Sequence, residues 1–264
     1  MNRVIPGLLL AGGWLLLLLY GSVHLFWVVL CVAAVIALHE LFRMTCPWLG
    51  GWRRPLAILA CVLPVIASFS GQSDLVLVGL IGSLLATAVI ALHGYAALED
   101  VLRFLLCSGF ASVYVAISVA HVVLLRFHPQ GAYWLLMLAA IVAGSDTGAY
   151  YAGRAFGERK LFPRISPKKT VAGGVGGLLA GMTAALLLGL FSPAPVRMPA
   201  LLLSAALLVV VGIAGDLTES MLKRAVGVKD SGAILFGHGG ILDRIDSLLL
   251  TGPVLYYLLH FGLL

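Results

Sequence analysis

Charge is concentrated in one segment of this chain, residues 215–247, with the sequence GDLTESMLKRAVGVKDSGAILFGHGGILDRIDS. The segment holds nine of the 28 Asp, Glu, Lys and Arg residues among 264 positions. Carboxylate oxygens suit a hard cation such as Mg²⁺ better than they suit zinc, and Lys and Arg side chains bind phosphate groups. This combination predicts chemistry on a polyphosphate.

The segment begins with the end of a helix. Asp216, Glu219, Ser220, Lys223 and Arg224 follow i, i+3, i+4, i+7, i+8 spacing, which places them on one helical face. A solvated helix end with favourable ion pairs is the structural alternative. We favour a functional role, because this helix continues directly from an apolar span.

A glycine-rich stretch, residues 228–240, follows and breaks the helix. Its glycines allow backbone N–H groups to approach an anion closely, while an ordinary loop is the alternative. Asp243 and Asp246 then open the next apolar run, three positions apart on one helical face. Complementing the helix dipole is the simpler explanation for these two acids. Because Asp216 ends the preceding span on the same side, we expect the three carboxylates to converge.

Two further clusters are expected on that side. Asp146, in AGSDTGAYYAGR, lies near the end of an apolar run, where an ionisable residue is costly and is therefore a functional candidate. Lys168 and Lys169, in SPKKT, stand at the entrance to the following run. A basic pair beside a membrane often serves only to fix topology. Beside the acidic cluster, the two lysines are candidate phosphate contacts.

The elements that must position these residues are membrane helices. Hydrophobic residues make up 61% of the chain and charged residues 11%, against about 25% charged in a typical soluble domain. Long apolar runs recur from end to end, which predicts an all-α, polytopic integral membrane protein. We expect about nine transmembrane helices, with eight as the alternative count. They cover residues 5–20, 23–38, 56–69, 75–92, 104–125, 133–151, 171–191, 200–215 and 245–263.

The distribution of basic residues sets the orientation. With nine spans, one side of the membrane holds 15 of the 17 Lys and Arg residues, and the other holds only Arg126 and Arg197. Basic loops belong in the cytoplasm, so we expect the N-terminus and every charged cluster there. We expect a single membrane domain, residues 1–264, with scaffold spans in 1–130 and the catalytic half in 131–264.

One glycine pattern predicts packing instead of chemistry. Gly173, Gly177 and Gly181 recur every four residues at the start of an apolar run, as in close helix–helix contacts. The run lacks the GK[ST] ending of a phosphate loop, so we expect it to pack against another helix.

At the charged motifs the chain resembles the phosphatidate cytidylyltransferase family, also called CDP-diacylglycerol synthases. The resemblance covers residues 145–247, through SDTGAYYAGR, SPKKT and Gly215-Asp216-Leu217. The remaining matching positions are Glu219, Ser220, Lys223, Arg224, Lys229, Asp230, Gly232, His238, Gly239, Gly240, Asp243, Arg244 and Asp246. Ala172 stands where the family commonly has an acid, and Phe236 where it commonly has Pro or Gly. These two departures leave the level of activity and the lipid acceptor open.

The resemblance implies transfer of CMP from CTP to phosphatidic acid, giving CDP-diacylglycerol and pyrophosphate in phospholipid biosynthesis. It implies Mg²⁺ as cofactor, with a second cation as a further candidate. We expect membrane lipids and a second copy of the chain as partners, but no nucleic acid. The expected location is the bacterial inner (plasma) membrane, with the active site facing the cytoplasm.

The expected site residues fall into three groups. Asp216, Asp243, Lys223 and Arg224 form the catalytic group. The substrate-binding group is Lys168, Lys169, Ser220, Lys229, His238, Gly239, Gly240 and Arg244. The metal-binding group is Asp146, Asp216, Asp243 and Asp246.

Two other functions are alternatives. A CTP-dependent kinase acting on a lipid alcohol needs a base such as Asp146, because an alcohol must be deprotonated before it attacks. A transporter or structural membrane protein fits less well, because the ionisable residues gather at one membrane edge instead of marking a path across the bilayer.

Overall fold

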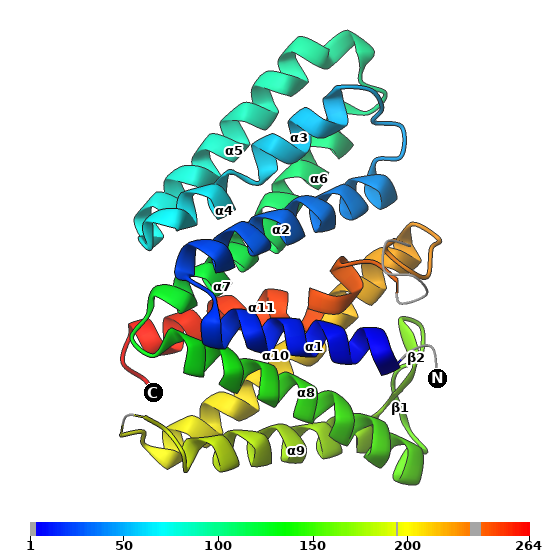
Figure 1. Ribbon diagram of the computed structural model, residues 1–264. Coiled ribbons are helices and arrows are strands. Elements are labelled where there is room, and N and C mark those ends of the chain that lie inside the picture. The colour runs from blue at the N-terminus through cyan, green and yellow to red at the C-terminus, as the bar shows by residue number, and fades with distance from the viewer. Residues whose placement is uncertain (1–3, 194, 233–238) are drawn as a thin grey trace. The chain divides into compact units, whose positions relative to one another are not determined.

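The structure is a computed structural model that describes residues 4–193, 195–232 and 239–264 (Figure 1). The described residues are mostly helical, with one small sheet. The α-helices are α1 (Val4–Tyr20), α2 (Val23–Thr45), α3 (Arg53–Cys61), α4 (Leu63–Ala67), α5 (Ser73–Gly94), α6 (Val101–Ala111), α7 (Ser118–Phe127), α8 (Gly131–Phe156), α9 (Val171–Gly189), α10 (Met198–Ala225) and α11 (Leu242–His260). The other elements are the 3₁₀ turns η1 (Ser68–Ser70) and η2 (Tyr95–Ala97), the π-helical stretch η3 (Ser112–Ile117), and the strands β1 (Lys160–Phe162) and β2 (Ser166–Thr170).

Each apolar run expected to cross the membrane falls on a helix or on consecutive helical segments. Six helical stretches of the described chain are by themselves long and apolar enough to span a bilayer: Val23–Thr45, Ser73–Gly94, Val101–Phe127, Gly131–Phe156, Val171–Gly189 and Met198–Ala225. The pair Arg53–Cys61 and Leu63–Ser70, bent by 41°, makes a seventh if it is counted as one span. The protein is therefore a polytopic, all-α integral membrane protein, as the sequence predicts. The count of nine spans stays a prediction.

The chain divides into two compact units. Unit 1 combines Met1–His128 with Val226–Ile245, and unit 2 combines Pro129–Ala225 with Asp246–Leu264. The described residues of the second segment of unit 1, 226–232 and 239–245, therefore group with the N-terminal helices.

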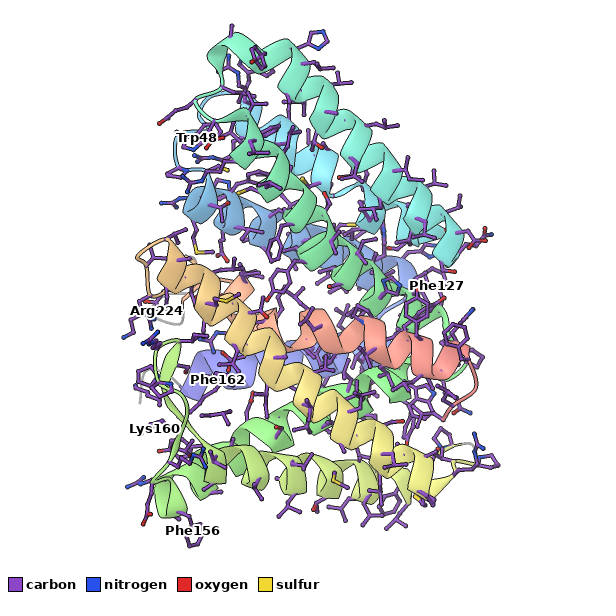
Figure 2. All side chains as sticks on the ribbon, turned by 180° about the vertical axis from the view of Figure 1, so that it is seen from behind. Trp48, Phe127, Phe156, Lys160, Phe162 and Arg224 are labelled. Atoms are coloured by element: carbon purple, nitrogen blue, oxygen red, sulfur yellow. The ribbon has the colours of Figure 1, made fainter. Side chains whose placement is uncertain are left out.

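The core of unit 1 forms around α2. This helix packs against α3, α6 and α7, and Phe26, Phe42 and Phe104 are completely or almost completely buried. The indole Nε1 of Trp27 donates a hydrogen bond to the Val65 carbonyl at 2.9 Å, which ties α2 to α4. The turn before α2 is set by a local cap, because the side chain of Ser22 accepts a hydrogen bond from the N–H of Leu25 at 3.1 Å. Figure 2 shows Trp48 and Phe127 at opposite ends of this unit.

Unit 2 is built on the close pair α8 and α9, which lie side by side in Figure 1. Gly173, Gly177 and Gly181 are buried where α9 meets its neighbours. A Cβ atom on Gly177 would lie only 2.9 Å from the Ser145 carbonyl oxygen of α8. Only glycine allows the two backbones to approach this closely, so the predicted helix–helix contact is confirmed.

The two ends of unit 2 differ in charge. At one end, the Arg197 guanidinium donates to the Gly262 carbonyl at 3.2 Å, beside the start of α10 and the end of α11. The end of α8, the two strands and the end of α10 lie together at the other end, where Figure 2 labels Phe156, Lys160, Phe162 and Arg224. The basic residues between 154 and 169 all belong to this second end, which agrees with the asymmetry of charge seen in the sequence.

The loop between α8 and α9 forms an antiparallel hairpin, which is not among the elements expected from the sequence. Lys160 pairs with Thr170, and Phe162 pairs with Ser166. Strand β2 is the SPKKT segment itself. Its last residue, Thr170, caps α9, because the hydroxyl oxygen accepts a hydrogen bond from the N–H of Gly173 at 3.0 Å. The hairpin and the cap together fix the SPKKT lysines at the entrance to α9.

Candidate functional site

Three acidic side chains of unit 2 come from three different helices. Asp146 lies on α8, Asp216 on α10, and Asp246 in the first turns of α11. A Cβ atom on Gly215 would lie 2.6 Å from the Asp246 carbonyl oxygen, so the backbones of α10 and α11 touch beside two of the acids. Glycine at this contact brings the carboxylates of unit 2 within electrostatic reach of one another.

Lys169 neutralises part of this acidic group. Its Nζ lies 2.6 Å from Oδ2 of Asp216. The Ser220 hydroxyl donates to Oδ1 of the same carboxylate at 3.3 Å. Both side chains of the ion pair remain partly accessible, 24% for Lys169 and 33% for Asp216. A pair this exposed contributes little net stability, so a ligand that offers each partner a better counterion can separate it.

A cavity of about 230 Å³ lies in unit 2 beside this ion pair. Its polar wall includes Asp146, Lys168, Lys169 and Asp216. Its other residues are mostly apolar or small: Val142, Ser145, Ala149, Tyr150, Leu161, Thr170, Gly173, Gly174, Leu208, Val209, Gly212, Ile213 and Ser247. A cavity lined by both charged and apolar residues suits a ligand that carries both a phosphate group and apolar surface.

Asp246 is half-buried at the start of α11, and the N–H of Ser247 donates a hydrogen bond to its Oδ1. A cation bound beside Asp246 would favour its ionised form.

The acids of unit 2 have the right chemistry for a hard cation but do not form a complete ligand set. Among the residues that the structure describes, no three His, Cys, Asp or Glu side chains are arranged to hold a metal ion. Asp216 is instead paired with Lys169. The carboxylate donors and the crowding of negative charge around Asp216 nevertheless fit Mg²⁺. Asp146, Asp216 and Asp246 therefore stay candidate ligands.

Two members of the predicted helical face on α10 pair inside the protein. Glu219 is completely buried, and its Oε2 lies 2.7 Å from Nζ of Lys223, one turn further along. Removing one partner from such a pair leaves a buried charge without compensation. Lys223 therefore has a structural role whether or not it also contacts a substrate. Arg224, the next residue, is exposed.

In unit 1, Asp243 is held by the segment that precedes it. Two N–H groups donate to its Oδ2, that of Gly240 at 2.8 Å and that of Ser231 at 3.0 Å, and the Ser231 hydroxyl lies 2.9 Å from the same oxygen. Gly239 has a φ of 78°, and a Cβ atom there would collide with the Asp243 carboxylate. The glycines of the motif thus allow the chain to close around Asp243.

Glu40, near the end of α2, is a candidate that the sequence motifs do not single out. It is only 2% exposed. Its carboxylate accepts hydrogen bonds from the N–H groups of Leu242 at 2.9 Å and Ile241 at 3.1 Å, and from the Ser231 hydroxyl at 3.2 Å. A signal was present, because an acidic residue that follows an apolar run is costly and marks a functional candidate.

The other expected residues are placed as follows. Lys229 and Arg244 are exposed in unit 1, and Ala172 is the second residue of α9. His238 and Phe236 lie outside the described residues. Asp243 belongs to unit 1, whereas the other three expected metal ligands belong to unit 2. Its convergence with them stays a prediction.

Comparison with known proteins gives matches along the whole chain. The model of the cytidylyltransferase family matches residues 1–262. The chain is 35% identical to the phosphatidate cytidylyltransferase of Bacillus subtilis (strain 168), over 98% of this chain and 97% of the relative. It is 38% identical to the phosphatidate cytidylyltransferase of Staphylococcus saprophyticus, over 86% of each chain. The chain therefore belongs to the cytidylyltransferase family.

Proposed function

We propose that this protein transfers CMP from CTP to phosphatidic acid and releases pyrophosphate. The product is CDP-diacylglycerol, an intermediate for phospholipid synthesis. The family match and the names of the relatives support a nucleotidyltransferase with these two substrates. Within the structure, one observation carries the proposal: a single cavity is lined by Asp146 and Asp216 together with Lys168 and Lys169.

The reaction requires two anions to meet. A phosphate oxygen of phosphatidic acid attacks the α-phosphorus of CTP, a new P–O bond forms, and the bond to the bridging oxygen of pyrophosphate breaks. Charge neutralisation and alignment are therefore the main tasks of the protein. Phosphatidic acid is already ionised near neutral pH, so no general base is required.

The lysines of β2 are suited to bind the phosphate groups. Lys169 already faces an anionic oxygen, the Oδ2 of Asp216, at 2.6 Å. A phosphate oxygen that takes the place of this carboxylate would gain the same charge-assisted contact. Lys168, the adjacent residue, lines the same cavity. We assign both side chains to phosphate binding.

The carboxylates of unit 2 would hold Mg²⁺. Asp146, Asp216 and Asp246 supply the oxygen donors, and an exchange of Lys169 for the ion at Asp216 would keep that carboxylate compensated. When bound, the ion would screen the negative charge of the substrates and stabilise the leaving pyrophosphate. For Asp243, Arg224 and Arg244 we retain the catalytic and phosphate-binding roles that the family motif implies, whereas the buried pair with Glu219 gives Lys223 a structural role.

The apolar part of the cavity suits the lipid substrate. Leu208, Val209 and Ile213 line it from α10, and Val142 lines it from α8. Apolar walls next to charged groups would accept the glycerol and the first carbons of the acyl chains. We place the site on the cytoplasmic side of a bacterial inner membrane, because the basic residues of unit 2 gather at the same end as the cavity lysines.

The position of the CTP phosphate whose label appears in the lipid product tests the proposal directly. Purified protein is incubated with Mg²⁺, with phosphatidic acid or in parallel with a lipid alcohol, and with CTP labelled either at the α- or at the γ-phosphate. We expect label in the lipid product from α-labelled CTP alone, and no product when EDTA replaces Mg²⁺. Transfer of the γ-label to a lipid alcohol would instead identify a kinase, and absence of any labelled lipid would refute an enzyme of this class.

A further inference from the structure

The buried carboxylate of Glu40, in unit 1, contacts two segments of the chain. One is Ser231–Gly232, within the glycine-rich stretch, and the other is Gly240–Leu242, at the end of that stretch. The Ser231 hydroxyl donates to Glu40 at 3.2 Å from the first segment. From the second segment, the N–H groups of Ile241 and Leu242 donate at 3.1 and 2.9 Å. Glu40 is about 200 positions away in the sequence, so this contact closes a very long loop.

The local backbone is shaped to receive this carboxylate. A Cβ atom on Gly232 would lie 2.5 Å from Oε1 of Glu40, and a Cβ atom on Gly240 would collide with Oε2. The two glycines thus leave the space that the carboxylate occupies. A buried negative charge is costly unless it is compensated by hydrogen bonds. Here two backbone N–H groups at the start of α11 compensate it, where the helix dipole also favours an anion. The Ser231 hydroxyl, which lies within reach of both Glu40 and Asp243, is a third donor that the two carboxylates share.

The same residues that hold Glu40 also hold Asp243. Ser231 donates to Asp243 through its N–H at 3.0 Å, and its hydroxyl lies 2.9 Å from Oδ2 of Asp243. A hydroxyl has one hydrogen, so Ser231 can donate through it to only one of the two carboxylates at a time. The N–H of Gly240 donates to Asp243 at 2.8 Å, while the next two N–H groups donate to Glu40. The position of Asp243 is therefore coupled to that of Glu40.

We infer that Glu40 is a positioning residue, which fixes the Ser231 and Gly240 anchors and thereby holds Asp243 in its reactive orientation. This inference rests on the proposed function, because it assigns Asp243 to the CMP-transfer reaction. Glu40 itself is buried, so we assign it no direct contact with a substrate.

Glu40→Gln tests the inference with little change in volume. The amide nitrogen cannot accept a hydrogen bond, so it would face N–H donors and lose at least one of the three contacts. We expect kcat to fall by at least tenfold, while KM for CTP and for phosphatidic acid stays within about threefold. Glu99→Gln is the matched control, since Glu99 is an exposed residue of the same unit, and it should behave as wild type.

Two further measurements separate positioning from a general loss of folding. Ser231→Ala removes the hydroxyl that lies between the carboxylates, and we expect its effect on kcat to be non-additive with that of Glu40→Gln. Hydrogen–deuterium exchange should accelerate in peptides that cover residues 239–246 of Glu40→Gln, with no change in Glu99→Gln. If Glu40→Gln does not fold, the kcat and the hydrogen–deuterium exchange of Ser231→Ala alone test the inference.

The outcomes are distinct. A wild-type level of kcat and of exchange in Glu40→Gln would overturn the inference. Additive effects of the two substitutions, or a rise in KM with kcat unchanged, would also overturn it. If the wild-type protein makes no CDP-diacylglycerol, the proposed function fails, and the exchange comparison alone decides whether Glu40 anchors the segment.

Discussion

The contact between α8 and α9 predicts that Gly177→Ala slows the enzyme more than it destabilises the fold. The new Cβ atom would lie 2.9 Å from the Ser145 carbonyl oxygen and 3.0 Å from the Ser145 hydroxyl oxygen. Ordinary contact begins at 3.4 Å, so the helices must separate by about 0.5 Å at this point. Because Ser145 directly precedes Asp146, the candidate metal ligand moves with the helix.

The two effects can be given magnitudes. Overpacking of a close contact costs about 1–3 kcal/mol, and replacing glycine by alanine in a helix restores about 1 kcal/mol of helix propensity. The free energy of unfolding should therefore fall by about 0–2 kcal/mol, which leaves the enzyme folded. A misplacement of about 1 Å can slow catalysis about 100-fold, so a shift of half that size should lower kcat about tenfold.

Initial rates with α-labelled CTP at saturating substrate concentrations give kcat, and thermal unfolding of the same detergent-solubilised sample gives stability. Gly109→Ala on α6 is the activity control, because a Cβ atom there meets nothing within 4 Å. Gly174→Ala is the stability control on the same helix as Gly177. Gly174 lies one turn before Gly177, and a Cβ atom there also meets nothing within 4 Å. A kcat within twofold of wild type in Gly177→Ala would refute the claim that this contact positions Asp146. An equal loss of kcat in Gly109→Ala would refute it as well.

Two other substitutions test the charged residues of unit 2. Lys223→Met should lower the free energy of unfolding by about 3–5 kcal/mol, and adding Glu219→Met should recover most of the loss in a chemical denaturation assay. A double variant no more stable than Lys223→Met would point to packing instead of charge. Asp216→Asn should abolish CMP transfer at unchanged membrane expression, and near-wild-type rates would exclude Asp216 as a required ligand.

The positions of the helices could be predicted from the sequence, because length and hydropathy are local properties. The predicted ends of the spans differ from the ends of the helices where a helix continues past its apolar run. The expected second span stops at residue 38, whereas α2 continues to Thr45 because Leu41 and Phe42 remain buried on its inner face. Glu40 lies within this extension. The error in the helix end and the omission of Glu40 therefore have the same cause.

The sequence also predicts that some of the candidate site residues lie close together. Asp146, Asp216 and Lys169 line the same cavity, as expected from their motifs, while their roles in the reaction stay a prediction. The hairpin could not be predicted, because its strands are short and polar and depend on their pairing with each other. The 41° bend between α3 and α4 had a visible signal in Pro64, which lacks the N–H that an unbroken helix needs.

The two ion pairs of unit 2 differ in a way that predicts which lysine binds phosphate. Lys169 and Asp216 are partly exposed, at 24% and 33%, whereas Lys223 and Glu219 are at 13% and 0%. An exposed pair contributes about 0–1 kcal/mol and separates easily, but breaking a buried pair costs about 3–5 kcal/mol. Substrate binding should therefore draw Lys169 away from Asp216 and leave Lys223 with Glu219.

This difference gives opposite expectations for two substitutions. Lys169→Met should raise KM for CTP by about tenfold or more with little loss of stability, since one charge-assisted phosphate contact contributes about 1.5–3 kcal/mol. Lys223→Met should mainly destabilise the protein. Steady-state kinetics and denaturation of both variants distinguish these effects. A Lys169→Met enzyme with unchanged KM for CTP would show that Lys169 serves Asp216 alone, and phosphate binding would then have to be assigned to other basic residues.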